Sequence, residues 1–272
     1  MNFSNKTVFI TGGSRGIGKA IAHKLASLGA NIAIAAKTTT PHPKLEGTIY
    51  TAQAELEALG AKVIAIPCDI RDEAQVAEAI QRTADAFGGI DILINNASAI
   101  SLTNTEDTES KKYDLMMNIN VRGTFLVTQH ALPWLKKSNS AHILTLSPPL
   151  SFKEKWLAPH IPYTISKYNM TMLSMGWSAE FKPYGIAVNT LWPRTTIATA
   201  AVQNLLGGDA LIQCSRKPEI LADTAAIILS KASSYTGHNL IDEEVLQQEG
   251  ITDLGKYAVN PEQRLYTDLF LD

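Results

Sequence analysis

The sequence has 272 residues, of which 45% are hydrophobic, and its 24 basic and 26 acidic residues give a net charge of −2. This length and apolar content suffice for one large core, whereas the balanced charge excludes a strongly basic surface for nucleic acid or an anionic membrane. Two cysteines, Cys68 and Cys214, are too few for a disulfide framework and indicate a reducing compartment.

The first residues, MNFSNKTVFITGG, lack the basic and long apolar stretches of a signal peptide. No run elsewhere approaches the ~18 apolar residues that cross a bilayer. We therefore expect a soluble, cytoplasmic protein without a membrane span.

Short β-branched and apolar runs alternate with longer helical patterns along the chain. After the first run, Ile17, Ile21, Leu25 and Leu28 recur at helical intervals and Gly29 follows as a stop signal. Such alternation is typical of a parallel sheet covered by helices on both faces. The predicted fold is α/β, a doubly wound parallel sheet with strands at residues 7–11, 31–36, 62–68, 90–95, 142–147, 185–192 and 238–241.

No repeat or flexible linker divides the chain, so we expect a single domain over residues 1–272. Its cofactor half would span about 6–120, and its catalytic and substrate half about 121–272. The stretch 38–50, TTTPHPKLEGTIY, is long for a strand-to-helix connection. It either covers a bound cofactor or is a surface loop without ligand contact.

The turn at residues 11–18, TGGSRGIG, follows a predicted strand and opens a helix. Glycines permit a tight turn and a close backbone approach, and a helix amino terminus attracts anions. This placement predicts a dinucleotide-binding turn rather than an ordinary glycine-rich turn. The residues assigned to the cofactor here are Gly12, Gly13, Ser14, Arg15, Gly16, Ile17 and Gly18.

Further motifs follow this turn in a familiar order: Asp69 after the third strand, NNAS at 95–98, NINVRG at 118–123, and YTISK at 163–167. Together they resemble the short-chain dehydrogenase/reductase family. The resemblance implies a Rossmann fold, a nicotinamide cofactor, a small carbonyl or alcohol substrate, and a homodimer or homotetramer joined through helices around 107–135 and 163–181. It also implies that Asp69 accepts the adenine amino group and that Asn96 holds the turn beneath the cofactor.

The choice of nicotinamide depends on the end of the second strand. An NAD enzyme of this layout usually has Asp or Glu there, which would repel a 2′-phosphate. This sequence has Lys37 instead, and the resemblance places Arg15 near the same phosphate. We therefore predict NADP(H), with NAD(H) as the alternative; the two cations could also be ordinary surface residues.

Tyr163 and Lys167 are four residues apart, so on a helix they share one face. A cation beside a phenol lowers the phenol pKa, which gives a general acid or base for carbonyl chemistry. We predict this role for Tyr163, with Lys167 tuning it and holding the nicotinamide ribose. For Asn120, the resemblance implies a proton route through a bound water, whereas its residue type also suits a helix N-cap.

The serine that should assist Tyr163 is ambiguous, because the segment LSPPLS at 146–151 has prolines at the expected place. Alignment on the strand favours Ser147, and counting back from Tyr163 favours Ser151. We assign Ser147 as the oxyanion donor, because a strand end can redirect its side chain. A third possibility is that Tyr163 donates alone, which would leave a slower enzyme.

The six histidines show no metal-ligand spacing, so no metal is predicted. His160 precedes Tyr163 by three residues, where it either touches substrate or is a plain loop histidine. The substrate would lie against residues 194–216, after Pro193-Arg194, where the family usually has Pro-Gly and its nicotinamide contact. An apolar pocket there, or simply core, would include Leu191, Trp192, Ile197, Leu205 and Leu206.

These patterns predict an NADP(H)-dependent oxidoreductase that transfers a hydride between the nicotinamide and a hydrophobic carbonyl compound or secondary alcohol. The alternative is a catalytically weak or inactive NADP(H)-binding protein that acts as a sensor or scaffold.

Overall fold

Seven parallel strands form one sheet in the order β3-β2-β1-β4-β5-β6-β7 in the computed structural model, which describes residues 1–42 and 45–272. The register pairs Val8 of β1 with Ile32 of β2 on one side and with Ile92 of β4 on the other. The strand order therefore reverses beside β1, the place where doubly wound sheets bind their ligands. The strands are β1 (Thr7–Thr11), β2 (Asn31–Ala36), β3 (Val63–Pro67), β4 (Ile92–Asn95), β5 (His142–Leu146), β6 (Ala187–Trp192) and β7 (Asn239–Ile241).

The predicted fold class is confirmed, and each predicted strand is present. The third to seventh strands are shorter than expected by one or two residues at an end, the third at both ends, which is the ordinary uncertainty of strand boundaries. All five residues of β1 and of β5 are buried, as are four of the six in β2. Continuous burial explains why these strands appear in the sequence as uninterrupted apolar runs.

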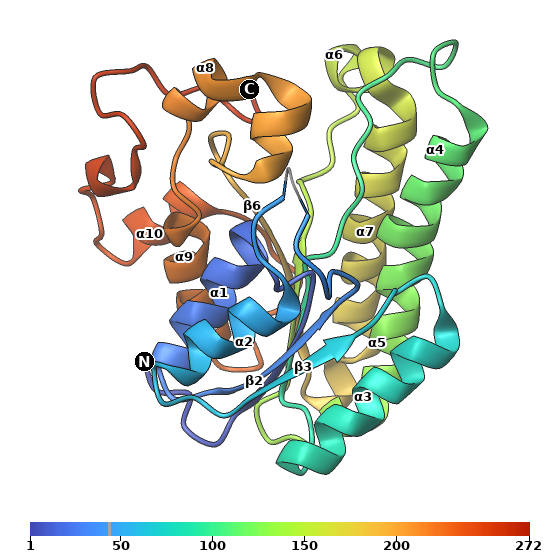
Figure 1. Ribbon diagram of the computed structural model, residues 1–272, viewed down its shortest axis with the longest axis vertical. Helices are drawn as coiled ribbons and strands as arrows, with labels where there is room; N and C mark the ends of the chain where they lie inside the picture. Colours follow the sequence, from blue (N-terminus) through green and yellow to red (C-terminus); the bar gives the residue numbers. More distant parts are fainter. Residues whose placement is uncertain (43–44) are drawn as a thin grey trace.

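Helices cover both faces of the sheet (Figure 1). On one face lie α1 (Gly16–Ser27), α2 (Ile49–Glu57), α9 (Glu219–Leu229) and α10 (Asp242–Gln248). The other face has α3 (Glu73–Phe87), α4 (Ser110–Met116), α5 (Thr124–Leu135) and α7 (Ile161–Glu180). Shorter segments are α6 (Glu154–Leu157), α8 (Gly208–Gln213), 3-10 turns at Ala158–His160, Lys182–Tyr184 and Gly255–Tyr257, and π-helical turns at Met117–Gly123 and Val202–Leu206.

Local signals set the helix ends. The Asp72 carboxylate caps α3 by accepting from the backbone N–H of Ala74 at 3.0 Å, and Gly88 ends the helix in the left-handed region at φ +86°. The Thr48 hydroxyl caps α2 and accepts from the N–H of Thr51 at 3.1 Å. These are the residue types that favour such positions, so the helix boundaries follow from local sequence.

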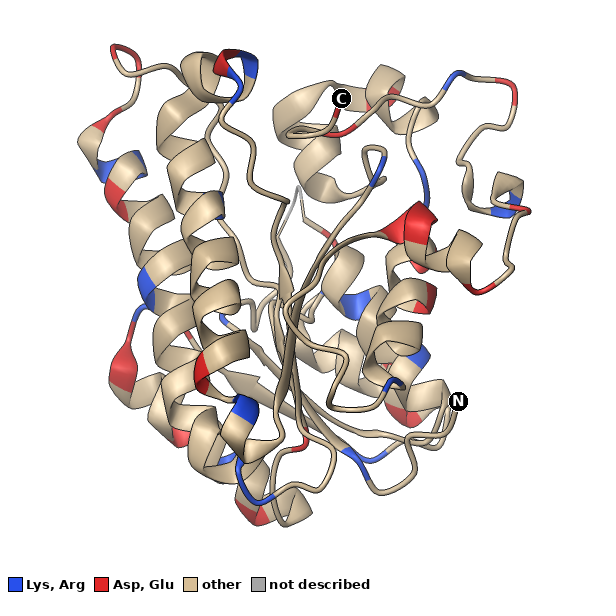
Figure 2. Ribbon diagram, turned by 180° about the vertical axis from the view of Figure 1, so that it is seen from behind, with Lys and Arg blue, Asp and Glu red and all other residues tan. Residues whose placement is uncertain are grey.

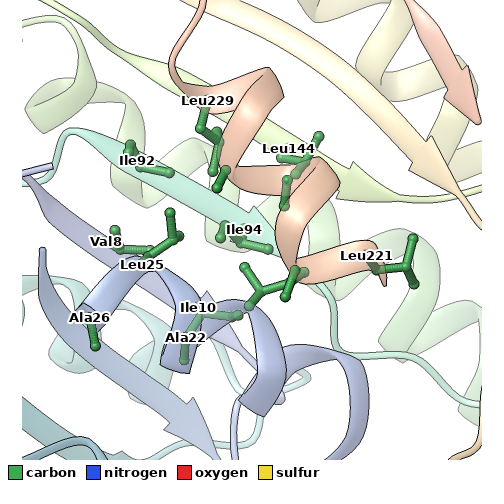
Figure 3. Close-up of a cluster of buried hydrophobic side chains, with 14 of the residues drawn as sticks. Val8, Ile10, Ala22, Leu25, Ala26, Ile92, Ile94, Leu144, Leu221 and Leu229 are labelled. Carbon is green, nitrogen blue, oxygen red and sulfur yellow. The ribbon is translucent and has the colours of Figure 1, made fainter. Parts of the chain in front are cut away.

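Two apolar cores result, one on each face of the sheet. The first packs β1, β4 and β5 against α1 and α9, and Figure 3 shows Leu25 of α1 and Leu229 of α9 over Val8 and Ile94. The second packs the other face against α3, α5 and α7. Two closed cores hold the strand ends rigidly, so the loops at the carboxyl edge are carried on a fixed frame.

Charged residues of both signs are scattered over the helices and loops in the view of Figure 2. In the described part of the chain, no helix combines the length and the apolar character that a membrane span requires.

Candidate active site

The glycine-rich turn lies between β1 and α1, where its backbone closely approaches neighbouring groups. Gly12 has φ +69°, a conformation that residues with a side chain rarely adopt. A Cβ on Gly18 would lie 2.6 Å from the carbonyl oxygen of Gly12, so only glycine fits there. No side chain of the described residues caps the amino terminus of α1, and its first N–H groups are therefore available to an anion.

A cavity of about 680 Å³ opens over this turn. It extends from the carboxyl ends of β1, β2 and β3 to the loop after β4, and nine of the ten residues assigned from sequence only to the cofactor line it. They are Gly12, Ser14, Arg15, Gly16, Ile17, Gly18, Lys37, Asp69 and Asn96.

Gly13 is the one assigned turn residue that is not among the lining residues of this cavity. A Cβ at Gly13 would lie 2.9 Å from the side chain of Ile10 and 3.2 Å from that of Ile34. Gly13 thus faces the apolar core, where its small size lets the turn pack against β1 and β2.

Asn96 fastens the loop after β4 to the turn. Its side-chain amide donates to the carbonyl oxygens of Thr11 at 2.9 Å and Gly12 at 3.1 Å. The Thr11 hydroxyl in return accepts from the backbone N–H of Asn96 and Ala97 at 3.1 and 3.0 Å. This reciprocal set fixes the turn, as expected for Asn96, before any ligand binds.

Arg15 and Lys37 are both at the cavity, on adjacent strand ends. The Arg15 guanidinium donates to the carbonyl oxygen of Gly47 at 2.8 Å and so ties the turn to the connection after β2. Burial lowers the pKa of Arg15 from its usual value. Lys37 is exposed and lies close enough to Asp69 to help lower the pKa of that carboxyl.

The sequence allows two interpretations of the connection after β2: a cover over the cofactor or a plain surface loop. Thr38, His42 and Leu45 line the cavity, and α2 begins at Ile49, within the predicted stretch 38–50. Residues 43 and 44 of that stretch lie outside the described residues. The described part of the connection therefore forms one wall of the cavity.

Asp69 has a partner that the sequence analysis missed. Its carboxylate accepts from Arg71 Nε at 2.9 and 3.0 Å, and the hydrogen bonds from Arg71 hold the pKa of Asp69 below its usual range. A carboxylate has lone pairs for further donors, so this pairing leaves acceptor capacity toward the cavity. An Asp-x-Arg spacing after a strand is the signal that could have revealed the pair.

Tyr163 and Lys167 lie one turn apart on α7 and are 4% and 2% exposed. The ammonium of Lys167 donates to the carbonyl oxygen of Leu146 at 2.7 Å and lies 5.2 Å from the ring centroid of Trp192. Leu146 ends β5 and Trp192 ends β6. The pair thus lies at the carboxyl edge of the sheet, the same edge that carries the cavity.

The pKa of Tyr163 departs from the expectation that Lys167 lowers it. Burial raises the pKa of the Tyr163 phenol well above its usual range, and the carboxyl of Asp268 raises it further. Burial also lowers the pKa of Lys167 to about 7. Burial therefore opposes the expected lowering in this structure, and the tuning of Tyr163 by Lys167 stays a prediction.

Asn120 lies inside a continuous helical segment, within the π-helical turn Met117–Gly123 that joins α4 to α5. Its side chain accepts from the N–H of Ala99 at 2.7 Å and donates to the carbonyl of Ala99 and to the hydroxyl of Ser166, both at 2.9 Å. The N-cap interpretation of Asn120 is therefore wrong, since the helix begins ten residues earlier at Ser110. Asn120 instead links the cavity wall to α7 through a helical distortion that is frequent at functional sites.

Neither candidate serine is hydrogen-bonded to Tyr163. The fully buried Ser147 hydroxyl accepts from the Thr171 hydroxyl at 2.9 Å, and Thr171 lies about 12 Å beyond Tyr163 along the axis of α7. The backbone N–H of Ser151 donates to the Tyr168 hydroxyl at 3.2 Å, and that hydroxyl donates to the Ser151 carbonyl at 2.8 Å. The prolines of this segment thus fix Ser147 against the far part of α7, which leaves its catalytic role a prediction.

His160 is the buried residue of the 3-10 turn Ala158–His160, with its ring centroid 6.2 Å from that of Tyr163. Its Nδ1 is 3.2 Å from the Thr164 hydroxyl, and burial lowers the pKa of its imidazole. His160 is therefore no exposed loop residue. Within the described residues, no three His, Cys, Asp or Glu side chains form a group that could hold a metal ion.

The apolar residues proposed around the substrate lie in different parts of the structure. Leu191 and Ile197 belong to the core on the α1 face. Trp192 packs in a third cluster with Tyr163, whereas Leu205 is 65% exposed and lines the cofactor cavity. The Arg194 backbone N–H donates to the Asp242 carboxylate at 2.8 Å, so this residue has its own anchor in place of the family glycine.

Two residues near the end of the sequence complete the site and were missed. Phe270 is 3% exposed and packs on Tyr163, with ring centroids 6.1 Å apart. Burial raises the pKa of Asp268 to about 7, and its carboxyl influences both Tyr163 and Lys167. The cluster LFL between two acids was the only hint in the sequence.

A glycine-rich turn under a nucleotide-sized cavity, with a Tyr-x-x-x-Lys pair at the same sheet edge, defines the class of this protein. A family model described as short chain dehydrogenase matches residues 6–208. The chain belongs to this family of oxidoreductases, whose members bind a nicotinamide cofactor and act on small molecules.

Particular relatives refine this placement. The chain is 58% identical to hydroxysteroid dehydrogenase-like protein 2 of Xenopus laevis over 98% of its own length and 63% of the relative's length. A short chain dehydrogenase from Mycobacterium thermoresistibile is 53% identical, with a TM-score of 0.94, and the match covers 99% of this chain and 96% of that one. A short chain dehydrogenase from Burkholderia cenocepacia J2315, solved in complex with NADP, is 30% identical with a TM-score of 0.75 and coverage of 89% and 97%.

Proposed function

We propose that this chain is an NADP(H)-dependent oxidoreductase that interconverts a hydrophobic carbonyl compound and its secondary alcohol. The observation that carries the proposal is the position of Tyr163 and Lys167, one turn apart on α7 at the sheet edge where the dinucleotide cavity opens. At this edge a substrate carbonyl could contact both the proton donor and a nicotinamide.

The residues of the cavity fit a dinucleotide. The close contacts at Gly18 leave room only for bare backbone, and the uncapped amino terminus of α1 is suited to a pyrophosphate. Lys37 and Arg15 supply positive charge where an adenosine 2′-phosphate would lie, and Ala36 ends β2 where an acid would favour NAD(H). The complex of a relative with NADP supports the same preference.

When bound, NADPH supplies the hydride. Tyr163 donates the proton to the carbonyl oxygen, and accepts it in the reverse direction. Lys167, already held by the Leu146 carbonyl, binds the ribose and keeps a positive charge beside the phenol. Asn120 holds the loop at Ala99 and contacts Ser166 on α7, and we assign it the proton route from Lys167 toward solvent.

The partner of Tyr163 at the carbonyl oxygen is best assigned to no serine. The Thr171 hydroxyl contacts the Pro148 carbonyl at 2.7 Å and the Ser147 hydroxyl at 2.9 Å, which holds the Ser147 hydroxyl beside Thr171. We therefore favour proton donation by Tyr163 alone. Ser147 would be the oxyanion donor only if removal of its hydroxyl caused a large loss of rate.

The competing function is an NADP(H)-binding sensor or scaffold with little catalysis. The burial of Tyr163, which raises its phenol pKa, favours this alternative, because a poorly accessible phenol is a poor acid–base group. It requires only the cavity and predicts binding without turnover.

We further propose that copies of the chain associate through α4, α5 and α7. Large apolar side chains are exposed on these three helices, a feature typical of interaction surfaces. They are Tyr113, Leu115, Phe125, Met172 and Met175.

The test is NADPH consumption with a panel of ketones and aldehydes. We expect turnover with hydrophobic carbonyl compounds and a loss of about 100-fold or more in kcat for Tyr163→Phe. The matched control Tyr184→Phe, at an exposed position after α7, should retain activity. Binding of NADPH without turnover, unchanged by Tyr163→Phe, would establish the binding protein instead.

A further inference from the structure

The last residues of the sequence turn back across the site at the carboxyl edge of the sheet. We call residues 266–272 the closing segment. The carbonyl of Tyr266 accepts from the N–H of Thr196 at 2.9 Å, and the N–H of Asp268 donates to the carbonyl of Arg194 at 3.0 Å. The indole N–H of Trp192 donates to the carbonyl of Leu269 at 2.9 Å. The closing segment is thus paired with the chain that follows β6.

The far end of the closing segment is fastened to the start of α6 and the residue before it. The Asp272 carboxylate pairs with the ammonium groups of Lys153 and Lys155, and the contact to Lys155 is 2.5 Å. These two lysines are 60% and 55% exposed, so salt and solvent weaken the pairs. The closing segment therefore extends from the chain after β6 to the start of α6, and its contact with α6 is weak.

Phe270, within the closing segment, packs among five aromatic rings. Its ring centroid is 6.1 Å from that of Tyr163, and the other four centroids lie 5.3 to 6.0 Å away. Those rings belong to Tyr168, Trp192, His160 and Trp156.

The consequence for the reaction is steric. A carbonyl oxygen must come within about 2.6–3.2 Å of the phenol to receive its proton. Tyr163 is 4% exposed beneath Phe270 and Leu271 and is absent from the lining of the cofactor cavity, which reaches Ala99 and Ile100. A ring-bearing group of a substrate that approaches Tyr163 from this side would need the place that Phe270 occupies.

The closing segment also adopts a conformation with a cost. Phe270 has φ +72°, in the left-handed region that residues with a Cβ avoid. The half-buried Asp268 carboxylate accepts a hydrogen bond from the backbone N–H of Leu269 at 2.7 Å. The charge of a second acid, Asp242, raises the pKa of Asp268. Local strain and a poorly solvated acid favour release of the segment when a ligand offers better contacts.

We propose that Leu269–Leu271 occupies the substrate site in place of an apolar, ring-bearing group of the substrate, and that substrate binds only as this segment leaves. The inference rests on the proposed function. It assigns the substrate class as carbonyl compounds whose apolar part carries a ring of about the size of the Phe270 side chain. The walls left for it are Ile100, Leu150, Trp156, Leu157 and Trp192.

The first test measures binding of acetophenone, a ring-bearing ketone, to the full chain saturated with NADP⁺, in which no reduction can occur. Phe270→Ala should bind it about tenfold or more tightly than the unaltered protein, because the competing closed state is weakened. Lys153→Ala removes one ion pair of Asp272 and should tighten binding about threefold by loosening Asp272. Phe152→Ala, at an 82% exposed ring of the same loop, should change nothing.

The second readout is hydrogen exchange at the amide of Asp268, which is protected by the Arg194 carbonyl. Saturating acetophenone should accelerate this exchange in the unaltered protein. Equal or weaker binding by Phe270→Ala, slower or unchanged exchange on saturation, or no binding by any of these proteins would overturn the inference. The proposed function fails separately, if variants that bind acetophenone consume no NADPH with it or with any other carbonyl compound.

Discussion

At the scale of single residues, the proposed preference for NADP(H) depends on a few charges at one end of the cavity. Lys37 follows β2, where a carboxylate would accept the ribose hydroxyls of NAD(H), and Arg15 lies across the turn from it. Both cations lie near one strand end, so their fields add for a 2′-phosphate. Arg15 is also held by Gly47, which makes Lys37 the cleaner position to alter.

Replacing Lys37 by aspartate should reverse this preference. We expect the ratio of kcat/KM for NADPH over NADH to fall by about tenfold or more, because the carboxylate repels the 2′-phosphate and accepts ribose hydroxyls. Lys62→Asp is the matched control, since Lys62 is exposed and precedes β3 at the opposite edge of the sheet. A ratio that stays constant in Lys37→Asp would remove Lys37 from cofactor selection.

A second residue-scale prediction concerns Ser147. Donation by Tyr163 alone predicts that Ser147→Ala lowers kcat by less than about tenfold, as the Thr171 hydroxyl keeps its bond to the Pro148 carbonyl. Loss of a true oxyanion donor would cost about 100-fold or more. Steady-state kinetics of Ser147→Ala and Ser151→Ala side by side distinguish these outcomes, and a large loss in the former would restore the serine mechanism.

Residue types and spacing predicted much of the site. The turn at 11–18 and the pair Tyr163 and Lys167 are set by local patterns, because strand, turn and helix bring them to one edge. The direction of a side chain such as Ser147, and a pKa such as that of Tyr163, depend on neighbours far along the chain. Burial under Phe270 has no local signal, so the sequence could not indicate that desolvation raises the pKa of Tyr163.

At the scale of elements, the closing segment couples the site to pH through Asp268. Burial raises the pKa of Asp268 to about 7, against an unfolded value of about 3.9. A raised folded pKa gives stability that is fully present below the unfolded pKa and is lost as pH rises through the folded pKa. The charged groups near it are Lys167, which favours the ionised form, and Asp242, which opposes it.

Asp268→Asn removes this titration and should therefore gain stability, relative to the unaltered protein, as pH increases from 5 to 8. The difference in the free energy of unfolding should change by about 2 kcal/mol across that interval. Urea unfolding at both pH values measures it, with the exposed Glu262→Gln as a control. If the free energy of unfolding changed equally with pH in Asp268→Asn and in the unaltered protein, Asp268 would be ionised and well solvated in the folded state.

The elements that sequence patterns missed are those without a regular period. The π-helical turn around Asn120 lies inside a helix, and the helix signal continues through it, so the pattern suggested a helix start there. The closing segment has no alternation and forms single bridges rather than a strand, as between Thr195 and Thr267. Such segments are ordered by tertiary contacts, which local propensity does not encode.

At the scale of the whole molecule, the sheet order places every chemical group at one edge. Reversal of the strand order beside β1 opens the cavity there, and β5 and β6 end beside Tyr163 and Lys167. The alternation of apolar runs and helical patterns was enough to predict this architecture, because continuous burial of parallel strands is a strong signal. It could not predict that the chain returns to cover the tyrosine.

The central claim is that a hydride moves between NADPH and a carbonyl carbon at this edge. The most direct measurement uses NADPH deuterated at the transferring position of the nicotinamide, with acetophenone or a related ketone, and mass spectrometry of the product alcohol. We predict that one deuterium appears on the carbinol carbon, and that Tyr163→Phe reduces its rate of appearance by about 100-fold or more. No deuterated alcohol with any hydrophobic ketone, despite saturating NADPH, would contradict the claim and leave a nucleotide-binding protein.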